Sequence, residues 1–249
     1  MKAALVTGAS RRAGIATAVG HALAADGWGL ALTGFPPHDA SEGWTSEPEE
    51  LAAELEAAWH EVDLADTDAP ARIFDLAGDV SALVNVHAHS ETGGVLEVTP
   101  EQLDRHFAVN ARGTALLCAE FARRFSGEPG EGRIVNFTSG PPLAGELAYA
   151  ASKGAIEWIT LSAAAELAHR GITVNAVDPG PTDTGWMSPE LRERIESEMP
   201  LGRLGRPQDS AALVAFLCSP EGGWITGQVI RSDGGWSSAR TLRLGREPR

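Results

Sequence analysis

Short apolar runs alternate with longer segments of helical pattern along the whole of this sequence. The first run, Ala3–Thr7, ends at Gly8, and an amphipathic segment then continues from Gly14 to Asp26. Such alternation is typical of βαβ units, in which parallel strands form one sheet with helices on both faces. The expected strands are 3–7, 29–33, 59–62, 81–86, 133–137, 171–177 and 228–231. We therefore predict an α/β fold in which residues 1–249 form a single doubly wound domain around a parallel seven-stranded sheet.

The composition is that of an ordinary globular chain, and it narrows the range of partners. Hydrophobic residues make up 43% of the chain, and the formal net charge is −14. A strongly negative balance disfavours nucleic acid and anionic membrane surfaces as partners. No apolar run approaches the roughly 18 residues of a transmembrane helix, and no signal peptide is recognisable. We expect a cytoplasmic protein with free, buried thiols at Cys118 and Cys218.

A glycine-containing turn follows the first expected strand. It reads Thr7-Gly-Ala-Ser-Arg-Arg-Ala-Gly14-Ile15, and a helical pattern begins at its end. Strand, glycine-rich turn and helix form the arrangement that holds a pyrophosphate against a helix N-terminus. Gly8 allows the tight bend, and Gly14 allows the backbone to approach a phosphate. The turn therefore indicates a Rossmann-type dinucleotide site.

The next strand bears on which dinucleotide is bound. In such folds an acid at the end of this strand holds the ribose 2′-hydroxyl, whereas basic surroundings accept a 2′-phosphate. No acid directly follows the run 29–33, since Asp39 comes several residues later, and Arg11 and Arg12 stand in the neighbouring turn. NADP(H) is therefore favoured over NAD(H), the alternative being that both arginines are simply solvated. Asp63, at the next strand end, suits an adenine amino group or, equally, the capping of a helix.

Tyr149 and Lys153 lie four positions apart near the start of a long helical segment, 146–170. Side chains at this spacing share one face of a helix, so the phenol and the ammonium can point into the same space. A neighbouring cation favours the phenolate, and we expect Lys153 to lower the pKa of Tyr149 from its reference of about 10. Tyr149 would then act as a general acid and base near neutral pH. An ordinary exposed pair on an amphipathic helix is the alternative.

Polar residues and glycines also mark the ends of several expected strands. These positions are Gly8, Asn85, Ser139 and Pro179-Gly180. The carboxyl ends of parallel strands meet at one edge of a sheet, where doubly wound folds bind their ligands. Asn110 lies inside the helical segment 100–125, where asparagine is unfavourable. It either caps a neighbouring strand or clamps a water or backbone group beside the site.

The sequence also predicts the local structure or role of three further segments. The polar stretch 36–48 contains Pro, Gly and Ser and is expected to be a loop. The region 184–206 contains a charged helical segment, 189–199, between Pro- and Gly-containing loops, which is typical of a substrate lid. The basic and polar tail, 237–249, is expected to fray.

Together these residues resemble the motifs of the short-chain dehydrogenase/reductase family, and the resemblance runs from end to end. It rests on the Thr7-Gly8 turn, Asp63, Asn85, Asn110, Ser139, Tyr149 with Lys153, Pro179-Gly180 with Thr184, Ile225-Thr-Gly and Asp233-Gly-Gly. The branch that the chain most resembles is that of the 3-oxoacyl-carrier-protein reductases.

The resemblance implies an NADP(H)-dependent oxidoreductase that interconverts a ketone and a secondary alcohol on a small-molecule substrate. Tyr149 would exchange a proton with the substrate oxygen, and Lys153 would bind the nicotinamide ribose. Ser139 would hydrogen-bond the substrate oxygen, and Asn110 would hold a water that links Lys153 to solvent. The cofactor-binding residues would be Gly8, Ser10, Arg11, Arg12, Gly14, Ile15, Asp63, Leu64, Asn85, Tyr149, Lys153, Pro179, Gly180, Thr182 and Thr184. No metal site is expected.

The sequence departs from the family's pattern in three places. The glycine turn is two residues longer than the usual Thr-Gly-x-x-x-Gly-x-Gly, which places Arg11 and Arg12 unusually. The common Asn-Asn-Ala-Gly reads Asn85-Val86-His87-Ala88, and a histidine at position 87 is bulky enough to obstruct a cofactor. The gap from Ser139 to Tyr149 is about three residues shorter than usual, which puts the reach of the serine in question. His87 and His89 together lack a third ligand for a metal.

Other functions and the assembly state follow from the same features. The altered segment 85–88 motivates a non-catalytic dinucleotide-binding sensor or scaffold as the main alternative, and an epimerase or dehydratase is a narrower one. Members of the family are commonly tetramers or dimers, so we expect a homotetramer or homodimer. The helical segments 100–125 and 146–170 would form one interface.

Overall fold

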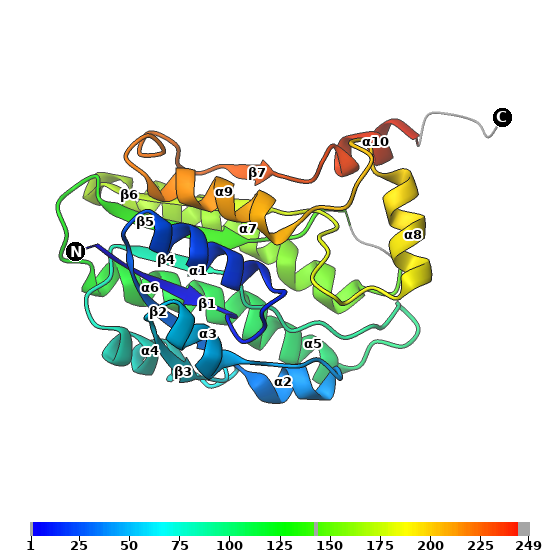
Figure 1. Ribbon diagram of the computed structural model, residues 1–249, viewed down its shortest axis with the longest axis horizontal. Helices are drawn as coiled ribbons and strands as arrows, with labels where there is room; N and C mark the ends of the chain where they lie inside the picture. The colour runs from blue at the N-terminus through cyan, green and yellow to red at the C-terminus, as the bar shows by residue number, and fades with distance from the viewer. Residues whose placement is uncertain (1, 142–143, 244–249) are drawn as a thin grey trace.

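The computed structural model describes residues 2–141 and 144–243, and a single seven-stranded sheet forms its centre (Figure 1). All neighbouring strands are parallel, in the order β3-β2-β1-β4-β5-β6-β7. The strands are β1 (Ala3–Thr7), β2 (Gly29–Gly34), β3 (Ala58–Glu61), β4 (Ala82–Asn85), β5 (Gly132–Phe137), β6 (Ile172–Asp178) and β7 (Val229–Arg231). The predicted doubly wound α/β fold is confirmed. The strand order reverses between β1 and β4, which is where such folds open a ligand-binding crevice.

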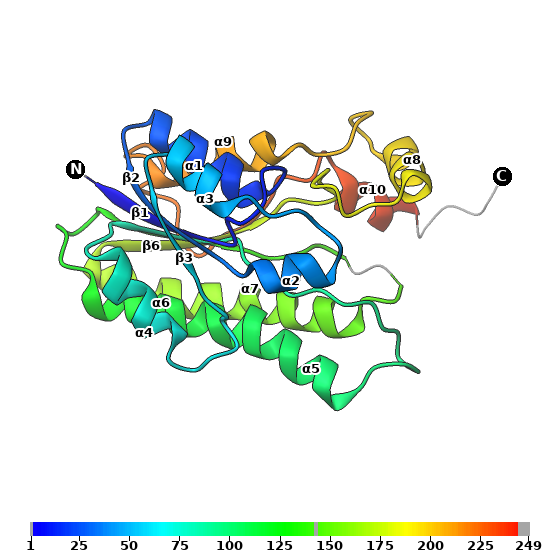
Figure 2. The same cartoon turned by 60° about the horizontal axis from the view of Figure 1, so that its bottom comes forward.

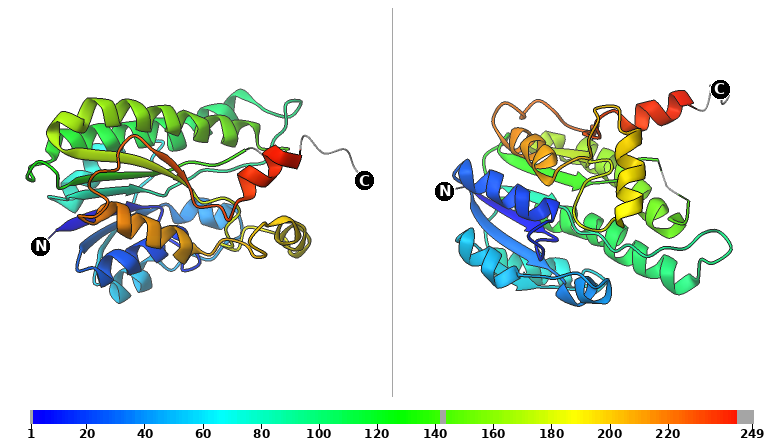
Figure 3. Two further views of the ribbon diagram at one scale, coloured as in Figure 1. Left: turned by 90° about the horizontal axis from the view of Figure 1, so that it is seen from above. Right: turned by 45° about the vertical axis from the view of Figure 1, so that its right-hand side comes forward.

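Helices cover both faces of the sheet (Figure 2). One face carries α1 (Ile15–Ala25), α3 (Pro48–Glu54) and α9 (Pro207–Cys218). The other carries α4 (Ala69–Ala77), α5 (Pro100–His106), α6 (Thr114–Arg124) and α7 (Leu147–Leu167). The short helix α2 (Pro36–Ser41) follows β2, and α8 (Pro189–Glu198) and α10 (Trp236–Arg243) lie together beyond the carboxyl ends of the strands (Figure 3).

Each face of the sheet has its own apolar core. Successive side chains of a strand point to opposite faces, so Val6 packs with Val19 of α1 and Val214 of α9. Leu5, its neighbour on β1, packs with Leu117 of α6 on the other side. All five side chains are fully buried, and burial of an aliphatic side chain of this size contributes about 1.5–3 kcal/mol. The two cores fix the strand ends in space and so position the site.

Two of the expected segments have a different local structure. The stretch 36–48 was expected to be a loop, but it contains α2, because Pro36 and Pro37 occupy the first helical positions, where the fixed φ of proline suits a helix. The predicted helix 100–125 is interrupted by the π-helical segment Phe107–Gly113 between α5 and α6. A π-helical turn inserts extra backbone and is frequent at functional sites.

The C-terminal segment is more ordered than its composition predicts. Helix α10 includes Trp236 and Ser237, both buried, so the expectation that the chain frays from 237 is wrong there. Residues 244–249 of the predicted tail lie outside the described residues. The apolar cluster that joins α8 to α10 consists of Ile195, Met199, Leu204 and Trp236.

No helix in the described ranges, 2–141 and 144–243, is both long and apolar enough to cross a membrane.

Candidate active site

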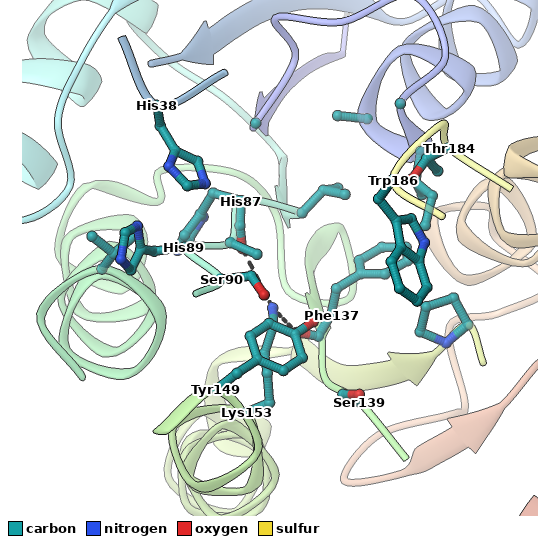
Figure 4. A pocket seen from close by; sticks show the side chains of 18 of the residues that line it. His38, His87, His89, Ser90, Phe137, Ser139, Tyr149, Lys153, Thr184 and Trp186 are labelled. Carbon is teal, nitrogen blue, oxygen red and sulfur yellow. Dashed lines mark hydrogen bonds between the residues drawn. The ribbon is translucent and has the colours of Figure 1, made fainter. Parts of the chain in front are cut away.

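A cavity of about 690 Å³ opens along the carboxyl ends of the strands. Its walls come from the turns after β1 to β6 and from the start of α7, and Figure 4 shows side chains converging on it from several elements. The predicted site residues that line it are Gly8, Ser10, Arg11, Gly14, Ile15, Asp63, Leu64, Ser139, Tyr149, Lys153, Pro179, Gly180, Thr182 and Thr184. Three predicted residues do not line it: Arg12, Asn85 and Asn110.

The turn between β1 and α1 has the geometry of an anion-binding site. Gly8 has a φ of +80°, and a Cβ atom there would stand 2.9 Å from the backbone of His87, so this bend requires glycine. Gly14 is the N-cap of α1, where no side chain caps the helix and the first turn has no acidic residue. The first amides of α1, beginning at Ile15, are therefore free of a side-chain cap at the positive end of the helix dipole.

Arg11 and Arg12 occupy different environments. Arg11 lines the cavity, where its guanidinium carbon lies 4.1 Å from the ring centre of Trp44. It also donates a hydrogen bond of 2.7 Å to the backbone oxygen of Thr184, which joins the first turn to the segment after β6. Arg12 is instead paired with Glu54 at 2.6 Å outside the cavity. The expectation that Arg12 contacts the cofactor is therefore not supported by its position, because a surface carboxylate holds it.

Asp39 belongs to the cavity, although its distance from β2 in the sequence concealed it. Helix α2 brings this buried residue back against the first turn, where it accepts a hydrogen bond of 2.5 Å from Ser10 Oγ. Both side chains line the cavity. The sequence interpretation missed it because the intervening chain was expected to be a loop. An acid thus stands near the end of the second strand after all.

Tyr149, Lys153 and Ser139 meet in the cavity (Figure 4). The first two project from α7, with Lys153 Nζ at 6.0 Å from the ring centre of Tyr149. Ser139, in the loop after β5, hydrogen-bonds to the side chain of Tyr149, so the short gap between them does not prevent contact. Lys153 Nζ donates to the backbone oxygens of Phe137 at 3.0 Å and His87 at 3.4 Å.

The electrostatics of this pair contradict one expectation. Burial raises the pKa of Tyr149 above its ordinary value, and the Glu146 carboxylate adds to the rise, while the hydrogen bond with Ser139 acts in the opposite direction. Burial also lowers the pKa of Lys153 to about 7. Lys153 is therefore only partly charged at neutral pH, and the phenol is not acidified. The argument from helical spacing failed here because it left out the loss of hydration that burial brings.

Asn110 clamps the loop that follows β4. It lies fully buried in the π-helical segment, where its Oδ1 accepts a hydrogen bond of 2.7 Å from the amide of His89. Its Nδ2 donates to the backbone oxygen of His89 and to Ser152 Oγ, both at 2.9 Å. The side chain is thus a backbone clamp behind the cavity wall and does not cap a strand.

His87 is among the residues that line the cavity, but its ring is held by two interior side chains. Its Nδ1 lies 2.7 Å from Thr7 Oγ1 and its Nε2 lies 3.3 Å from Thr114 Oγ1, and neither threonine lines the cavity. Burial and, next, the positive charge of Lys153 lower the pKa of His87 to about 3. The imidazole is therefore neutral and held in the interior by two hydroxyl groups.

Asn85 and Asp63 show how strand ends can differ. Asn85 Nδ2 donates to Asn136 Oδ1 at 2.9 Å across β4 and β5, so its side chain lies inside the sheet and not at the expected cofactor position. Asp63 lies in the cavity wall, where its Oδ2 pairs with Arg105 at 3.0 Å. Its Oδ1 accepts from the amide of Ala65 at 2.9 Å, and it does not cap a helix, because the N-cap of α4 is Asp68.

Three histidine rings gather beside α2, and no local pattern signalled them. The ring centre of His89 lies 4.8 Å from that of His38 and 4.7 Å from that of His106. Burial, followed by the charges of these neighbours, lowers the pKa of His89 to about 4. The rings come from three different elements, so only the tertiary fold brings them together. Within residues 2–141 and 144–243, no group of three or more His, Cys, Asp or Glu side chains is arranged to hold a metal ion.

The segment after β6 forms a part of the wall that adjoins the first turn. Gly180 has a φ of +59°, and a Cβ atom there would stand 2.5 Å from the Cβ of Asp233, so the close approach requires glycine. Thr182 Oγ1 donates to the backbone oxygens of Pro179 at 3.2 Å and Gly180 at 3.3 Å. Trp186 Nε1 in turn donates to the backbone oxygen of Thr182 at 3.1 Å. Internal hydrogen bonds thus hold this segment in shape.

Comparison with known proteins agrees with this geometry. A family model described as Enoyl-(Acyl carrier protein) reductase matches residues 8–237. A protein of Bacillus subtilis (strain 168) named "Uncharacterized oxidoreductase YjdA" is 44% identical and covers 94% of this chain and 96% of its own length. A short-chain dehydrogenase/reductase from Serratia marcescens BCRC 10948 has 32% identity and a TM-score of 0.83, covering 95% of this chain and 98% of its own. BdcA in complex with NADPH has 33% identity and a TM-score of 0.82, covering 94% and 93%.

The chain belongs to the short-chain dehydrogenase/reductase family, which is a family of oxidoreductases. The family model and these relatives cover nearly the whole chain, from the first turn to α10. The resemblance that the motifs predicted is therefore confirmed.

Proposed function

We propose that this protein is an NADP(H)-dependent oxidoreductase that interconverts a ketone and a secondary alcohol on a small-molecule substrate. The observation that carries the proposal is the meeting of Ser139, Tyr149 and Lys153 in a cavity that begins at the uncapped N-terminus of α1. The three side chains suit proton exchange with a substrate oxygen. The helix N-terminus suits the pyrophosphate of a dinucleotide. One cavity therefore combines a proton donor with a place for a hydride carrier.

The residues of the cavity fit a nicotinamide dinucleotide. Gly8, Gly14 and the first amides of α1 would hold its pyrophosphate, since glycine is required at Gly8 and no side chain caps the helix. Asp63 and Leu64 would hold the adenine, and the segment from Pro179 to Thr184 would hold the nicotinamide end. When bound, this cofactor supplies the hydride.

The protein's own groups would manage the proton. Tyr149 is protonated at neutral pH, as a phenol with a reference pKa of about 10 already is, and it would donate this proton to a carbonyl oxygen. Ser139 would hydrogen-bond the same oxygen as negative charge develops on it. Lys153 would stabilise the phenolate that remains, because a bound ligand with additional acceptors favours its charged form. The water that Asn110 was expected to hold stays a prediction, and the observed role of Asn110 is to fix His89.

Three observations bear on the choice between NADP(H) and NAD(H). Arg11 lines the cavity beside the first turn, where its positive charge would attract a 2′-phosphate. The related BdcA structure contains NADPH, which supports the same preference. Asp39 acts in the opposite direction, because a carboxylate beside Ser10 repels a phosphate. We place NADP(H) first because the cationic Arg11 lines the cavity and the related BdcA structure contains NADPH.

The test is turnover by the purified protein with defined substrates. NADPH oxidation is followed with a panel of ketones, and NADP⁺ reduction with the corresponding secondary alcohols, with each product identified by chromatography. We expect cofactor-dependent conversion of at least one pair. Tight dinucleotide binding without conversion of any pair would contradict the proposal.

A non-catalytic dinucleotide-binding sensor or scaffold is the second candidate. A relative from Escherichia coli (strain K12) is 32% identical over 95% of this chain and 98% of its own length, and it is named "Cyclic-di-GMP-binding biofilm dispersal mediator protein". Thermal-shift titrations with NADP(H), NAD(H) and cyclic-di-GMP, beside the turnover panel, separate the two candidates. An epimerase or dehydratase would instead convert a substrate without net oxidation of the cofactor.

A homotetramer or homodimer remains our proposal for the assembly. Trp158 and Leu161 on α7 are 75% and 38% exposed, and Phe107 beside them is 40% exposed. Exposed apolar side chains on neighbouring helices are typical of a protein interface. Size-exclusion chromatography with light scattering tests this, and a monomer mass at micromolar concentration would contradict it. A cytoplasmic location also stays a prediction.

The region 184–206 is proposed as the substrate lid. Thr184, Trp186 and Ile195 line the cavity, and α8 packs on α10 through its own apolar cluster. Closure over a substrate would exclude water from the reacting groups.

A further inference from the structure

Asp178 is a buried carboxyl group in the cavity wall for which the proposed chemistry has no role. It is the last residue of β6 and directly precedes Pro179-Gly180; the residue borders the cavity, but it is only 1% exposed and its Oδ2 atom is buried. Its Oδ1 accepts a hydrogen bond of 3.0 Å from the amide of Gly180. Its Oδ2 has no hydrogen-bond partner among the described residues. The carboxylate therefore has one buried acceptor without a hydrogen-bond partner, beneath the wall of the cavity.

The groups around Asp178 do not neutralise it. Arg231 Nε lies 3.9 Å from Oδ2, but the Arg231 side chain is 58% exposed, so water and salt screen this contact. Burial is the largest effect and raises the pKa of Asp178, and the charge of Asp233 adds to the rise, while the Gly180 backbone, the charge of Arg231 and the Gly140 backbone lower it. A buried carboxylate without a close cationic partner is costly. A positive charge in the cavity would reduce that cost.

The space around Oδ2 shows that this carboxyl group is held in place. A Cβ atom on Gly140 would stand 2.7 Å from Oδ2, so the loop that carries Ser139 passes directly over the carboxylate. The Gly180 amide holds the other oxygen from the opposite side. Asp178 thus lies between the loop of the proposed proton-transfer group and the segment proposed to hold the nicotinamide.

We infer that Asp178 strengthens binding of the oxidised dinucleotide relative to the reduced one. The inference rests on the proposed function, in which the segment that begins at Pro179 holds the nicotinamide end. The nicotinamide ring is positively charged when oxidised and neutral when reduced, so a nearby carboxylate attracts only the oxidised form. Asp178 would thereby stabilise the enzyme complex that contains the oxidised cofactor relative to the complex that contains the reduced cofactor, without changing the overall equilibrium in solution.

The test compares the affinities of NADP⁺ and NADPH in a charge-removing variant. Asp178→Asn keeps the shape of the side chain and the acceptor for the Gly180 amide, but it removes the negative charge. The Kd of NADPH is measured by its fluorescence and that of NADP⁺ by competition. We expect the ratio of Kd for NADP⁺ to Kd for NADPH to rise at least about fivefold, as Coulomb's law predicts for nearby charges at an effective dielectric of about 20.

The ratio is informative because the two ligands share all contacts except those that depend on the ring's redox state. A general loosening of the loops weakens both ligands and leaves the ratio unchanged. Asp178→Ser, which is smaller and also neutral, should raise the ratio in the same direction. Glu221→Gln is the matched control, since it removes the same charge from an exposed residue that precedes β7, at the opposite end of the strands.

An unchanged ratio in both folded Asp178 variants would overturn the inference and leave the proposed function standing. An equal rise in Glu221→Gln would also overturn it, because the effect would then report net charge alone. A wild-type protein that binds neither dinucleotide would overturn the proposed function itself, and the inference with it.

Discussion

The two walls of the cavity are built from different kinds of structure. The catalytic wall consists of Ser139, Tyr149 and Lys153, and it stands on β5 and on α7, a helix of 21 residues. The nucleotide wall consists of the first turn with Arg11, and of Asp39, which the six-residue helix α2 carries. A central strand and a long helix therefore hold the groups proposed for proton transfer. Short segments hold the groups proposed to choose the cofactor.

The geometry of the catalytic groups and the choice of cofactor therefore depend on different kinds of contact. On the catalytic wall, two of the three groups lie one turn apart on a single helix, so their separation is inherent to the helix. On the nucleotide wall, Arg11 contacts Trp44 and Thr184, which lie far from it and from each other in the sequence. Cofactor choice thus depends on contacts between distant segments. We expect it to change with single substitutions that leave the chemistry intact.

The largest effect is expected on the catalytic wall, from Lys153→Met. This change keeps the length of the side chain and removes the ammonium that stabilises the phenolate, so turnover should fall at least about a hundredfold. Steady-state kinetics and the Kd of NADPH are measured together. Lys2→Met, at an exposed lysine paired with Glu131, is the control and should leave turnover unchanged. Turnover of Lys153→Met within about threefold of wild type would remove Lys153 from the mechanism.

The same lysine predicts a pH dependence of stability. Its pKa is about 7 in the folded protein and about 10.4 in an unfolded chain, so between these values the unfolded state binds more protons. The free energy of unfolding of the wild type should therefore rise from pH 7 to about pH 9, relative to Lys153→Met, by about 1.4 kcal/mol per pH unit. Below pH 7 the difference should level off. Urea unfolding across this range measures it, and a flat difference would show that Lys153 is charged throughout.

A smaller effect is expected on the nucleotide wall, from Arg11→Ala. Loss of a charge-assisted hydrogen bond to a phosphate should weaken NADPH about tenfold, and NADH much less. Arg12→Ala is the matched control, because it removes the same charge from the next residue, which is paired outside the cavity. Isothermal titration with both cofactors gives the comparison. Equal weakening by the two variants would mean that general charge, not the position of Arg11, sets the preference.

The smallest effect is expected from Asp39→Asn. Removal of a carboxylate beside the first turn should strengthen NADPH relative to NADH about threefold, because a like charge is lost. Ser10→Ala removes the hydrogen bond to Asp39 and keeps the charge, so it should not improve NADPH. If Asp39→Asn instead weakens NADPH more than NADH, Asp39 does not face the ribose.

The same division explains how much of the molecule could be predicted from sequence. The sheet and the pair Tyr149 and Lys153 follow from local periodicity, because the apolar runs and the four-residue spacing are visible without tertiary contacts. Asp39 was placed outside the site because α2 is short and depends on Pro36 and Pro37 for its start. The contact of Asp39 with the first turn depends on the tertiary fold, which local sequence patterns do not show.

Side-chain direction and hydration also lie beyond local patterns. Asn85 was expected in the cavity, but the register that sets it opposite Asn136 turns it into the sheet. The pKa of Tyr149 was expected to fall, but burial raises it, and burial is a property of the finished fold. Asp178 was passed over for the same reason, since only the structure shows that this buried residue borders the cavity.

The central claim is that the phenol of Tyr149 exchanges the proton, and Tyr149→Phe tests it most directly. The change removes one oxygen and leaves the ring packed on α7. We predict that the Kd of NADPH stays within about twofold, while turnover with a ketone that the wild type reduces falls at least about a hundredfold, the scale of a lost general acid. Turnover close to that of the wild type, with NADPH binding retained, would contradict the account.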